Sequence, residues 1–584
     1  MSQPNPFIPF VPDNAPFSVE QRAWLNGFLA GMFSQQGAAG AVEEAAPAVK
    51  ATVLYGSQTG NAEALAGQAA KQLKAAGVEA TAVDMEAYSA DSISSEENLI
   101  LLTSTYGDGE PPDNAAGLHE FIMSDSAPKL DKTAFAVFGL GDTSYPEFCK
   151  CAKDFDSRFE ALGGRRLLDR VDADVEFEEP FESWIKTLST TLVESAGSAA
   201  AVAEVAPEAD AGPVYGKKNP FPATIVENYN LNGEESAKET RHVSISLEGS
   251  DLSYEAGDAL AVIPLNKPEL IEALIEKLGL SADDEVTGAD GEKKSLREAL
   301  SSDFEITNVT AKLAQSIQEL NKSEELKALL EDKKAFDDYC WGRDLLDLVT
   351  DYPVKFESAA ALIGILKKLS SRLYSISSSP DAHPGEVHVT VGRVFYEKEG
   401  RTRYGVCSDY LACLPEGDKL KVFTHTNKNF RPPVDPTKDA IMIGPGTGIA
   451  PFRAFLEDRI AKEAPGRNWL FFGDQKCATD FLYRETLETW FKDGKLHRLD
   501  TAFSRDQKEK IYVQNRIIEN ATEFFGWLEN GGYIYVCGDA SRMAKDVDAA
   551  IHKVIEIAGQ KSPDEAKEYV SALKKEKRYQ RDVY

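Results

Sequence analysis

The chain has 584 residues, and at ~150 residues per domain that length corresponds to about four folding units. Apolar residues make up 42% and charged residues 27% of the chain, proportions that exclude a fully disordered or fibrous protein. Asp and Glu total 95 against 64 Lys and Arg, and the net charge of −31 disfavours binding to nucleic acid or anionic lipid. Such a surface attracts a basic partner; alternatively, the excess acid serves only solubility.

The cysteines and the N-terminal sequence indicate the cellular compartment in which the protein is expected. The seven cysteines are odd in number and include no CxxC pair or zinc-finger spacing, which favours a reduced, cytoplasmic protein without a metal site. The chain begins MSQPNPFIPF, without the basic and apolar regions of a signal peptide. No window approaches the ~18–20 unbroken apolar residues of a membrane-spanning helix. We therefore expect no association with a membrane.

An amphipathic helix is predicted near the N-terminus, at residues 17–33. Ser18 is a suitable N-cap, and apolar residues then recur at helical spacing: Trp24, Leu25, Phe28, Leu29, Met32 and Phe33. One helix cannot bury this face alone, so it docks on its own chain, on a second copy or on another protein. We predict that residues 1–36 serve assembly or partner docking. Residues 37–49 and 195–214 are predicted linkers, because they contain few large apolar residues to bury.

Residues 50–194 form a first predicted domain, in which β and α patterns alternate. Five strand-like runs are each followed by a helical pattern, and they lie at residues 51–56, 78–84, 98–105, 133–140 and 165–170. Such repeats predict a parallel sheet covered by helices on both faces. Ligands of this architecture bind beyond the C-terminal ends of the strands.

Three loops at those strand ends suit a phosphate and a flat ring. SQTGN, at residues 57–61, leads from the first strand into a helix, and its backbone N–H groups and hydroxyls suit a phosphate monoester. It has no Lys and so is not a triphosphate-binding P-loop; a hydrogen-bonded turn is the alternative. TSTYGDGEPPDN and GLGDTSYPEFC, after the third and fourth strands, each offer glycine and one aromatic, Tyr106 or Tyr145, to stack on a ring. Either tyrosine is alternatively a half-buried rim residue.

These three motifs resemble the flavodoxin family, over residues 48–193. The resemblance implies that FMN is bound, with its phosphate held by Ser57, Gln58, Thr59, Gly60, Asn61 and Ala62. The isoalloxazine ring would be enclosed by Ser104, Thr105, Tyr106, Gly107, Leu140, Gly141, Asp142, Thr143, Ser144, Tyr145 and Cys149. Electrons would leave at the exposed edge of the ring, near Asp108, Glu110 and Asp113.

The pattern changes after residue 214. Residues 215–437 read as antiparallel strands, interrupted by a mainly helical insertion at about 267–369. RLYSISSSP carries Arg372, Tyr374 and Ser375, residue types that clamp a pyrophosphate, cover a ring and approach a flavin nitrogen; a surface strand is the alternative. TRYGVCSDYLACL places Gly405 at a turn that starts a helix, which is a second pyrophosphate nest.

Residues 438–584 again alternate β and α. IMIGPGTGIAPFRAF has the strand, glycine-rich turn and helix that let a dinucleotide approach the backbone. SRDQKEKIYVQ supplies Ser504, Arg505 and Lys510, which suit a 2′-phosphate and favour NADPH over NADH; a solvated charged loop is the alternative. Cys537 ends a later strand, either at the site or as a small buried apolar residue, and Tyr584 is the last residue.

This second half resembles the ferredoxin–NADP reductase family, because RLYS, GPGTGIAPFRAF, SRDQKEK, CGDASRMAKD and the terminal aromatic occur in the same order. The resemblance implies an antiparallel β-barrel that binds FAD and a doubly wound α/β domain that binds NADPH. FAD would be held by Thr307, Arg372, Leu373, Tyr374, Ser375, Thr390, Val391, Gly392, Tyr396, Gly405, Val406, Cys407, Ser408 and Tyr584. NADPH would be held by Gly446, Thr447, Ser504, Arg505, Lys510, Tyr512, Gln514 and Asp546. Hydride transfer would involve Ser375, Cys537, Asp582 and Tyr584, with Tyr584 as a movable lid.

A flavodoxin joined through a helical insertion to such a reductase is the arrangement of the diflavin reductase family, which the chain resembles over about residues 50–584. NWLFFG, SRDQKEKIYVQ and EKRYQRDVY are most similar to the flavoprotein components of NADPH-dependent assimilatory sulfite reductases. This implies electron flow from NADPH through FAD and FMN to a haemoprotein subunit with sirohaem and a 4Fe–4S cluster, in sulfate assimilation and cysteine biosynthesis. We also expect a homo-oligomer formed through the N-terminal helix. A stand-alone reductase for a haem protein and a flavodoxin-like assembly scaffold are the alternatives.

Overall fold

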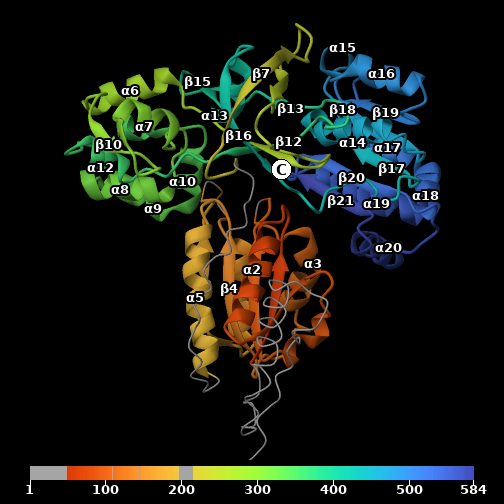
Figure 1. Ribbon diagram of the computed structural model, residues 1–584, viewed down its shortest axis with the longest axis horizontal. Helices are drawn as coiled ribbons and strands as arrows, with labels where there is room; N and C mark the ends of the chain where they lie inside the picture. The colour runs from red at the N-terminus through yellow and green to blue at the C-terminus, as the bar shows by residue number, and fades with distance from the viewer. Residues whose placement is uncertain (1–48, 108, 144, 146, 196–214) are drawn as a thin grey trace, which may run out of the picture.

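The computed structural model describes residues 49–107, 109–143, 145, 147–195 and 215–584. The predicted helix at residues 17–33 lies outside these residues, and so do the predicted linkers apart from Val49 and Ser195. Ser144, a predicted flavin contact, also lies outside them. The described chain contains two parallel α/β units, an antiparallel sheet and a helical insertion, which are the fold classes that the sequence predicts (Figure 1).

The first unit is a parallel sheet in the order β2-β1-β3-β4-β5. Its strands are β1 (Lys50–Gly56), β2 (Glu79–Asp84), β3 (Asn98–Ser104), β4 (Ala134–Leu140), β5 (Arg165–Arg166) and β6 (Val171–Ala173). The single strand expected at residues 165–170 is instead two short strands that both pair with β4, because the chain bends at Leu167 and Leu168, which pack on the core. The winding direction changes between β1 and β3, and sheets of this order bind ligands at that point.

Helices cover both faces of the first sheet, namely α2 (Asn61–Ala75), α3 (Asp113–Met123), α4 (Lys150–Ala161) and α5 (Glu178–Ser195). Strand side chains alternate between these faces. In β3, Ile100 and Leu102 join the core beneath α2 and α5, whereas Leu99 and Leu101 join the core beneath α3 and α4. One unbroken apolar strand therefore builds two cores, which is why strands of this kind are easily predicted.

The second unit is an antiparallel sheet in the order β12-β9-β16-β7-β8-β13. Its strands are β7 (Phe221–Asn230), β8 (Thr240–Ser246), β9 (Ala259–Ile263), β12 (Arg372–Ser375), β13 (Glu386–Gly392) and β16 (Lys419–His425). The edge strands approach each other at an isolated bridge between Ile376, just after β12, and Val389 of β13. The predicted barrel is therefore a curled sheet whose edges meet at a bridge rather than along a full ladder.

A helical insertion separates β9 from β12 and has its own buried core. Its helices are α6 (Pro268–Leu278), α7 (Leu296–Ser302), α8 (Ala311–Asn321), α9 (Glu324–Glu331), α10 (Lys333–Cys340), α11 (Leu345–Asp351) and α12 (Ala359–Ile363). A hairpin that the sequence did not predict, β10 (Glu285–Thr287) and β11 (Lys293–Ser295), lies between α6 and α7. A second hairpin, β14 (Phe395–Lys398) and β15 (Arg401–Tyr404), leads into α13 (Val406–Cys413).

The third unit is a parallel sheet in the order β19-β18-β17-β20-β21. Its strands are β17 (Ala440–Ile443), β18 (Asn468–Asp474), β19 (Arg498–Phe503), β20 (Tyr533–Gly538) and β21 (Tyr579–Val583). Its helices are α14 (Ala450–Ala461), α15 (Cys477–Asp480), α16 (Arg484–Lys492), α17 (Val513–Glu519), α18 (Ala521–Glu529), α19 (Met543–Ala558) and α20 (Pro563–Lys575). Separate buried clusters lie on its two faces, as the doubly wound prediction requires.

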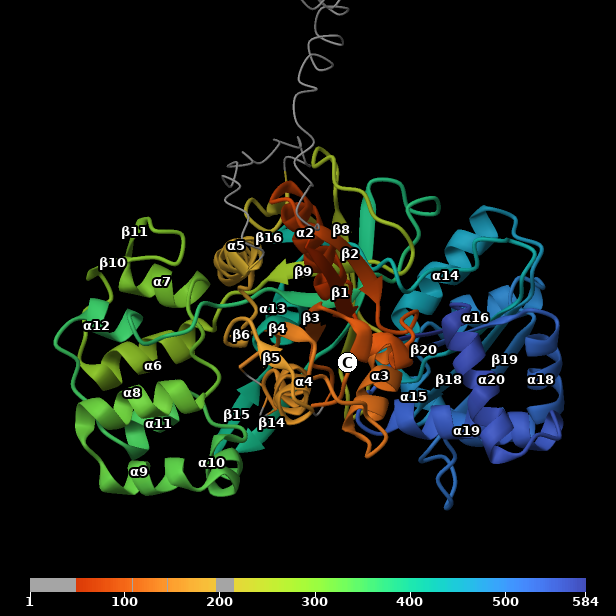
Figure 2. The same ribbon diagram turned by 90° about the horizontal axis from the view of Figure 1, so that it is seen from below.

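The three units meet around the end of β21, which lies at the centre of Figure 1. The hydroxyl of Tyr106 donates to the carbonyl of Val583 at 2.7 Å, and the Gln58 amide donates to the carbonyl of Arg581 at 3.4 Å. Figure 2, seen from below, shows the first unit between the helical insertion and the third unit. The predicted FMN loops therefore contact the strand that carries predicted hydride-transfer residues.

Candidate functional site

The first predicted loop lies between β1 and α2 and has the geometry of an anion site. Gly60 precedes α2 with a φ of 90°, a conformation that glycine adopts without strain. The buried Ser57 Oγ accepts from the N–H of Gly60 at 3.0 Å, and the Ser57 N–H donates to Asn114 at 2.8 Å. No described side chain caps α2, so its first N–H groups are available to an anion. The loop therefore fits the phosphate of FMN.

The two predicted ring-binding loops are joined through their backbones. The N–H of Thr105 donates to the carbonyl of Leu140 at 3.1 Å, which brings the loop after β3 beside the loop after β4. Tyr145 is 62% exposed, and Tyr106 is half-buried with its hydroxyl on β21. Cys149 is buried in the core, so it shapes its loop from behind. Both aromatics are at the carboxyl edge of the sheet, where the ring of FMN is expected.

On the second unit, one buried carboxylate organises the predicted FAD clamp. The Arg372 guanidinium pairs with Glu305 at 3.4 Å. Glu305 also accepts from the N–H of Thr307 at 2.7 Å and from its hydroxyl at 2.5 Å, and its side chain is only 6% exposed. Glu305 therefore holds two predicted FAD residues. The sequence analysis missed it, because no motif links it to an arginine 67 positions away.

The second predicted nest lies where β15 leads into α13. Helix α13 begins at Val406, and no described side chain caps it. A Cβ added to Gly405 would lie 2.6 Å from Ser408 Oγ and 3.0 Å from Val394 Cβ, so a larger residue there would displace the Ser408 hydroxyl. The Ser408 hydroxyl accepts from the N–H of Val394 at 3.1 Å. The uncapped start of the helix fits a pyrophosphate.

Other predicted FAD residues are engaged elsewhere. Thr390 is buried, and its hydroxyl bonds with the Tyr483 hydroxyl at 2.7 Å, in the packing between the second and third units. Tyr396 is 37% exposed and stacks on Trp341, with 5.5 Å between ring centroids. The Thr390 hydroxyl is therefore not presented at the clamp, whereas Trp341 adds an exposed aromatic that the sequence analysis missed.

The predicted hydride-transfer residues converge from different strands. Ser375 ends β12, and its hydroxyl donates to Asp582 of β21 at 2.9 Å. Cys537 of β20 pairs with Asp582 in register and is fully buried. The Tyr584 hydroxyl bonds with that of Thr447 at 2.8 Å, while the Tyr584 side chain remains 63% exposed. A hydroxyl, a carboxyl, a thiol and an exposed ring thus lie together.

Burial controls the protonation of this group. It raises the pKa of the Asp582 carboxyl, although the hydrogen bond from Ser375 opposes that shift. Burial also raises the pKa of the Cys537 thiol, and the neighbouring Asp582 charge adds to the rise. Cys537 is therefore a neutral thiol at neutral pH and not a nucleophilic thiolate. The group suits a reaction that needs neutral polar contacts rather than covalent attack.

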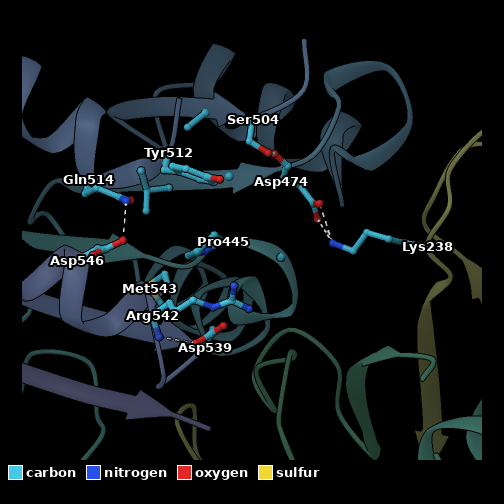
Figure 3. A pocket seen from close by; sticks show the side chains of 14 residues that line it. Lys238, Pro445, Asp474, Ser504, Tyr512, Gln514, Asp539, Arg542, Met543 and Asp546 are labelled. Atoms are coloured by element: carbon cyan, nitrogen blue, oxygen red, sulfur yellow. Dashed lines mark hydrogen bonds and ion pairs between the residues drawn. The ribbon is translucent and has the colours of Figure 1, made fainter. Parts of the chain in front are cut away.

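The third unit contains the pocket drawn in Figure 3. Its walls include four predicted NADPH residues of the loop after β19 and of α17 and α19, together with the glycine-rich turn: Ser504, Tyr512, Gln514, Asp546 and Gly446. Gln514 donates to Asp546 at 3.1 Å across one end. Arg505 and Lys510 are exposed on the same loop and do not line the pocket as it stands. The pocket thus brings together the hydroxyl and amide contacts but not the two predicted cations.

Two other cations line this pocket, and the sequence analysis missed both. Lys238, from the loop between β7 and β8 of the second unit, pairs with Asp474 at 2.7 and 2.9 Å. Arg542 lies at the start of α19 on the opposite wall. Lys238 is 236 residues from its partner, so no local pattern reveals it. Arg542 stands within CGDASRMAKD, where the motif itself was a usable signal.

The described residues contain neither a cluster of metal ligands nor a helix that could cross a membrane. No group of three or more His, Cys, Asp or Glu side chains is arranged to hold a metal ion. No helix there has both the length and the apolar character needed to span a bilayer. The seven cysteines all remain free thiols.

Known families match each of the three units. The flavodoxin family matches residues 53–184, the FAD binding domain family matches residues 214–410, and the oxidoreductase NAD-binding domain family matches residues 442–549. These matches agree with the anion loop of the first unit, the clamp of the second and the pocket of the third. The cofactors of the chain are FMN, FAD and NADPH.

Curated relatives match the chain over nearly its whole length. It is 46% identical to the sulfite reductase [NADPH] flavoprotein alpha-component of Bacillus subtilis, over 97% of this chain and 95% of that protein. It is 45% identical to the protein of the same name from Cronobacter sakazakii, over 100% and 99%, and 43% identical to that of Aliivibrio fischeri, over 97% and 95%. The chain therefore belongs to the sulfite reductase [NADPH] flavoprotein alpha-component family.

Proposed function

We propose that this flavin oxidoreductase passes electrons from NADPH through FAD and FMN to the sirohaem and iron–sulfur subunit of sulfite reductase. The proposed division is an FMN domain at residues 50–194, an FAD-binding domain at 215–437 and an NADPH-binding domain at 438–584. The observation that supports this route best is the contact of Tyr106, in a predicted FMN loop, with Val583, one residue from Asp582. This contact supports a short path between the proposed FMN site and the proposed hydride-transfer site.

The residues of the chain position the reactants. When bound, the flavins accept the electron pair of NADPH and release the electrons singly. Ser375 and Asp582 hold each other at 2.9 Å and, with the neutral thiol of Cys537, offer polar contacts to a nicotinamide. The exposed side chain of Tyr584, hydrogen-bonded to Thr447, is proposed as a lid that nicotinamide displaces.

The coenzyme's adenosine side is assigned to the pocket of Figure 3. Ser504, Tyr512 and Gln514 line it and are proposed to contact the 2′-phosphoadenosine. Arg505 and Lys510 are exposed next to Ser504 and Tyr512, so we propose that they approach the 2′-phosphate when the coenzyme binds. Two cations and a hydroxyl suit a phosphate better than a free ribose hydroxyl.

The proposed partner contact and the proposed assembly involve different parts of the chain. The net charge of −31 suits a basic docking surface on the haemoprotein. The apolar face predicted at residues 17–33 is proposed to join copies of the chain. Free thiols throughout are consistent with a cytoplasmic location, where disulfides are rare.

The test is to mix the flavin-loaded chain with the sirohaem subunit and follow NADPH-driven sulfide formation from sulfite. A matched variant, Gly60→Val, places a branched side chain at a φ of 90° and should strain the loop. It should lose FMN and sulfide formation while NADPH still reduces the FAD. Sulfide formation without FMN would contradict the route. The proposed partner would be wrong if the chain reduced another haem protein while a competent sirohaem subunit formed no sulfide.

A further inference from the structure

The segment between the helical insertion and β12 carries a lysine whose ammonium contacts the FMN domain. The Nζ of Lys367 donates to Asp142 at 2.9 Å, to the Thr143 hydroxyl at 3.0 Å and to Asp174 at 3.0 Å. These acceptors come from the loops after β4 and β6. An ammonium has three N–H donors, so the three bonds use its full capacity. The Lys367 side chain is only 22% exposed.

The acceptors on the FMN domain are themselves hydrogen-bonded to one another. The Thr143 hydroxyl donates to Asp174 at 2.6 Å, and the Thr143 N–H donates to the same carboxylate at 3.2 Å. Burial alone would raise the pKa of Asp174, but the bonds from Thr143, Val175 and Lys367 lower it. The carboxylate is therefore ionised at neutral pH, and the two loops form a preorganised cation site.

The backbone of Lys367 leads directly to the FAD clamp. Its carbonyl accepts from the N–H of Glu305 at 2.8 Å, and an antiparallel bridge between Phe304 and Lys368 extends this pairing. Glu305 is the buried carboxylate that holds Arg372 and Thr307. One short paired segment thus connects a loop expected to enclose FMN with the residues expected to hold FAD.

The neighbouring lysine provides a contrast. Lys368 makes an ion pair with Glu176 at 3.3 Å, between side chains that are 48% and 56% exposed. Lys333 and Lys567 also reach the FMN domain, but their side chains are 66% and 70% exposed. Exposed ion pairs contribute little, because water screens them and their long side chains must be ordered. Among these four lysines, Lys367 is the one that has three acceptors and a side chain with little exposure to solvent.

We propose that Lys367 is the anchor that docks the FMN domain on the FAD clamp. It fixes the ring-enclosing loop after β4 against the segment that positions Arg372, and so sets the approach of FMN to FAD. The inference rests on the proposed function and adds the residue that governs docking. Because coupling between two sites is reciprocal, occupation of the clamp by FAD also favours docking of the FMN domain.

The test compares Lys367→Ala with the matched variant Lys368→Ala in the full-length, flavin-loaded chain. Hydrogen exchange, measured by mass spectrometry without NADPH, reports on peptides covering residues 141–143 and 174–176. Loss of three charge-assisted bonds should raise exchange there about 10-fold or more in Lys367→Ala. Stopped-flow absorbance after mixing with NADPH should show FMN reduction slowed by a similar factor and FAD reduction unchanged. Lys368→Ala should change both less than about 2-fold.

Further variants separate docking from folding. Lys367→Arg should retain most of the protection, since it keeps the charge and several donors. Asp174→Asn weakens the same contact from the FMN side without touching the clamp, so it should reproduce the exchange change even if Lys367→Ala loses FAD. Wild-type exchange in both Lys367→Ala and Asp174→Asn, or equal effects of Lys367→Ala and Lys368→Ala, would overturn the proposal. Exchange needs neither NADPH nor a haemoprotein, so this result is independent of sulfide formation.

Discussion

Asp474 shows how a single carboxylate can determine the electrostatics of a coenzyme pocket. Its side chain is 2% exposed at the end of β18, and its Oδ2 lies 3.9 Å from the position of a Cβ on Gly446. Burial raises the pKa of Asp474, and Lys238 opposes the shift. Without that lysine, a buried negative charge would face the proposed site of the NADPH phosphates beside the glycine-rich turn.

Lys238→Ala should therefore raise the KM for NADPH about 10-fold. The KM for NADH should rise by a similar factor, since the turn beside Asp474 is expected to carry the pyrophosphate common to both coenzymes. Steady-state kinetics with each coenzyme measures this. The control is Lys476→Ala. Lys476 is an exposed lysine two residues beyond Asp474 and does not line the pocket. A change confined to NADPH would instead connect Lys238 with the 2′-phosphate.

Individual residues were predictable where a motif carries the chemistry, and not where a distant side chain supports it. Ser504, Tyr512 and Gln514, which were predicted from the loop's own sequence, line one pocket. Glu305 and Lys238 were missed, since each meets its partner only through tertiary packing, Glu305 within the second unit and Lys238 across to the third. Local pattern contains no information on such long-range pairs.

At the level of elements, the strands buried on both faces were the most predictable. The runs expected at residues 98–105 and 133–140 correspond to β3 and β4 within one residue at each end, because buried apolar residues run without a break through the centre of each strand. Strands β10 and β11 were missed, since three residues each are too few to establish a period. The bend at Leu167 was missed for the same reason.

Strands β8 and β13 and helix α14 share a buried histidine cluster. His388 accepts at Nδ1 from Arg453 at 3.3 Å and donates from Nε2 to Glu386 at 3.2 Å. Burial and Arg453 lower the pKa of His388 to about 4 and that of His242 to about 2. The His383 ring packs against that of His388 in a tilted arrangement, with 4.2 Å between centroids. Both low-pKa histidines are therefore neutral in the folded protein at neutral pH.

Acid should destabilise the protein through this cluster. An unfolded histidine titrates near ~6.5, so below that pH the unfolded chain binds more protons than the folded one. The contribution of His388 to the free energy of unfolding is complete above about pH 6.5 and is lost as the pH falls towards 4, by about 3 kcal/mol at most. The thermal unfolding midpoint, measured at about pH 7 and about pH 5, should fall less in His388→Gln than in the wild type.

The control for this prediction is His552→Gln. The hydrogen bond with Asp548 raises the pKa of His552, which is the opposite shift, so its removal should not reduce the sensitivity to acid. If the unfolding midpoint fell equally in the wild type and in His388→Gln, the histidine cluster would not be the cause of the destabilisation by acid.

Across the whole molecule, charge is divided between the FMN domain and the rest of the chain. Among the described residues, every ion pair between them places the carboxylate on the FMN domain and the cation on its partner. Arg581 with Asp113 and Lys545 with Glu110 are examples close to β21. The excess of acid in the sequence therefore has a role in docking as well as in solubility.

Salt should weaken this docking. Raising the ionic strength from about 0.05 to about 0.5 M shortens the screening length several-fold, so the exposed pairs should lose most of their attraction. Small-angle scattering should show a larger radius of gyration, and FMN reduction after NADPH mixing should slow. Sucrose at equal osmolality is the control for general solvent effects. An unchanged radius across this range would show that apolar contacts rather than charges hold the units together.

The relative placement of the units was the part of the structure that could least be predicted from the sequence. Motif order predicted three cofactor-binding units, but not that Tyr106 would reach Val583, 477 residues later. Such contacts depend on how finished domains pack, and no pattern within either loop specifies the other. The predicted helix at residues 17–33 and its proposed role in assembly lie outside the described residues.

The stack of Trp341 on Tyr396 has a practical optical consequence. Trp341 is 63% exposed, whereas Trp184, Trp469 and Trp527 are 5%, 0% and 3% exposed. A solvent-facing indole emits at longer wavelength than buried ones and is quenched by acrylamide. Subtracting the emission of Trp341→Phe from that of the protein therefore isolates the signal of Trp341, beside the expected FAD site. This signal can be used to follow the binding of FAD without an attached dye.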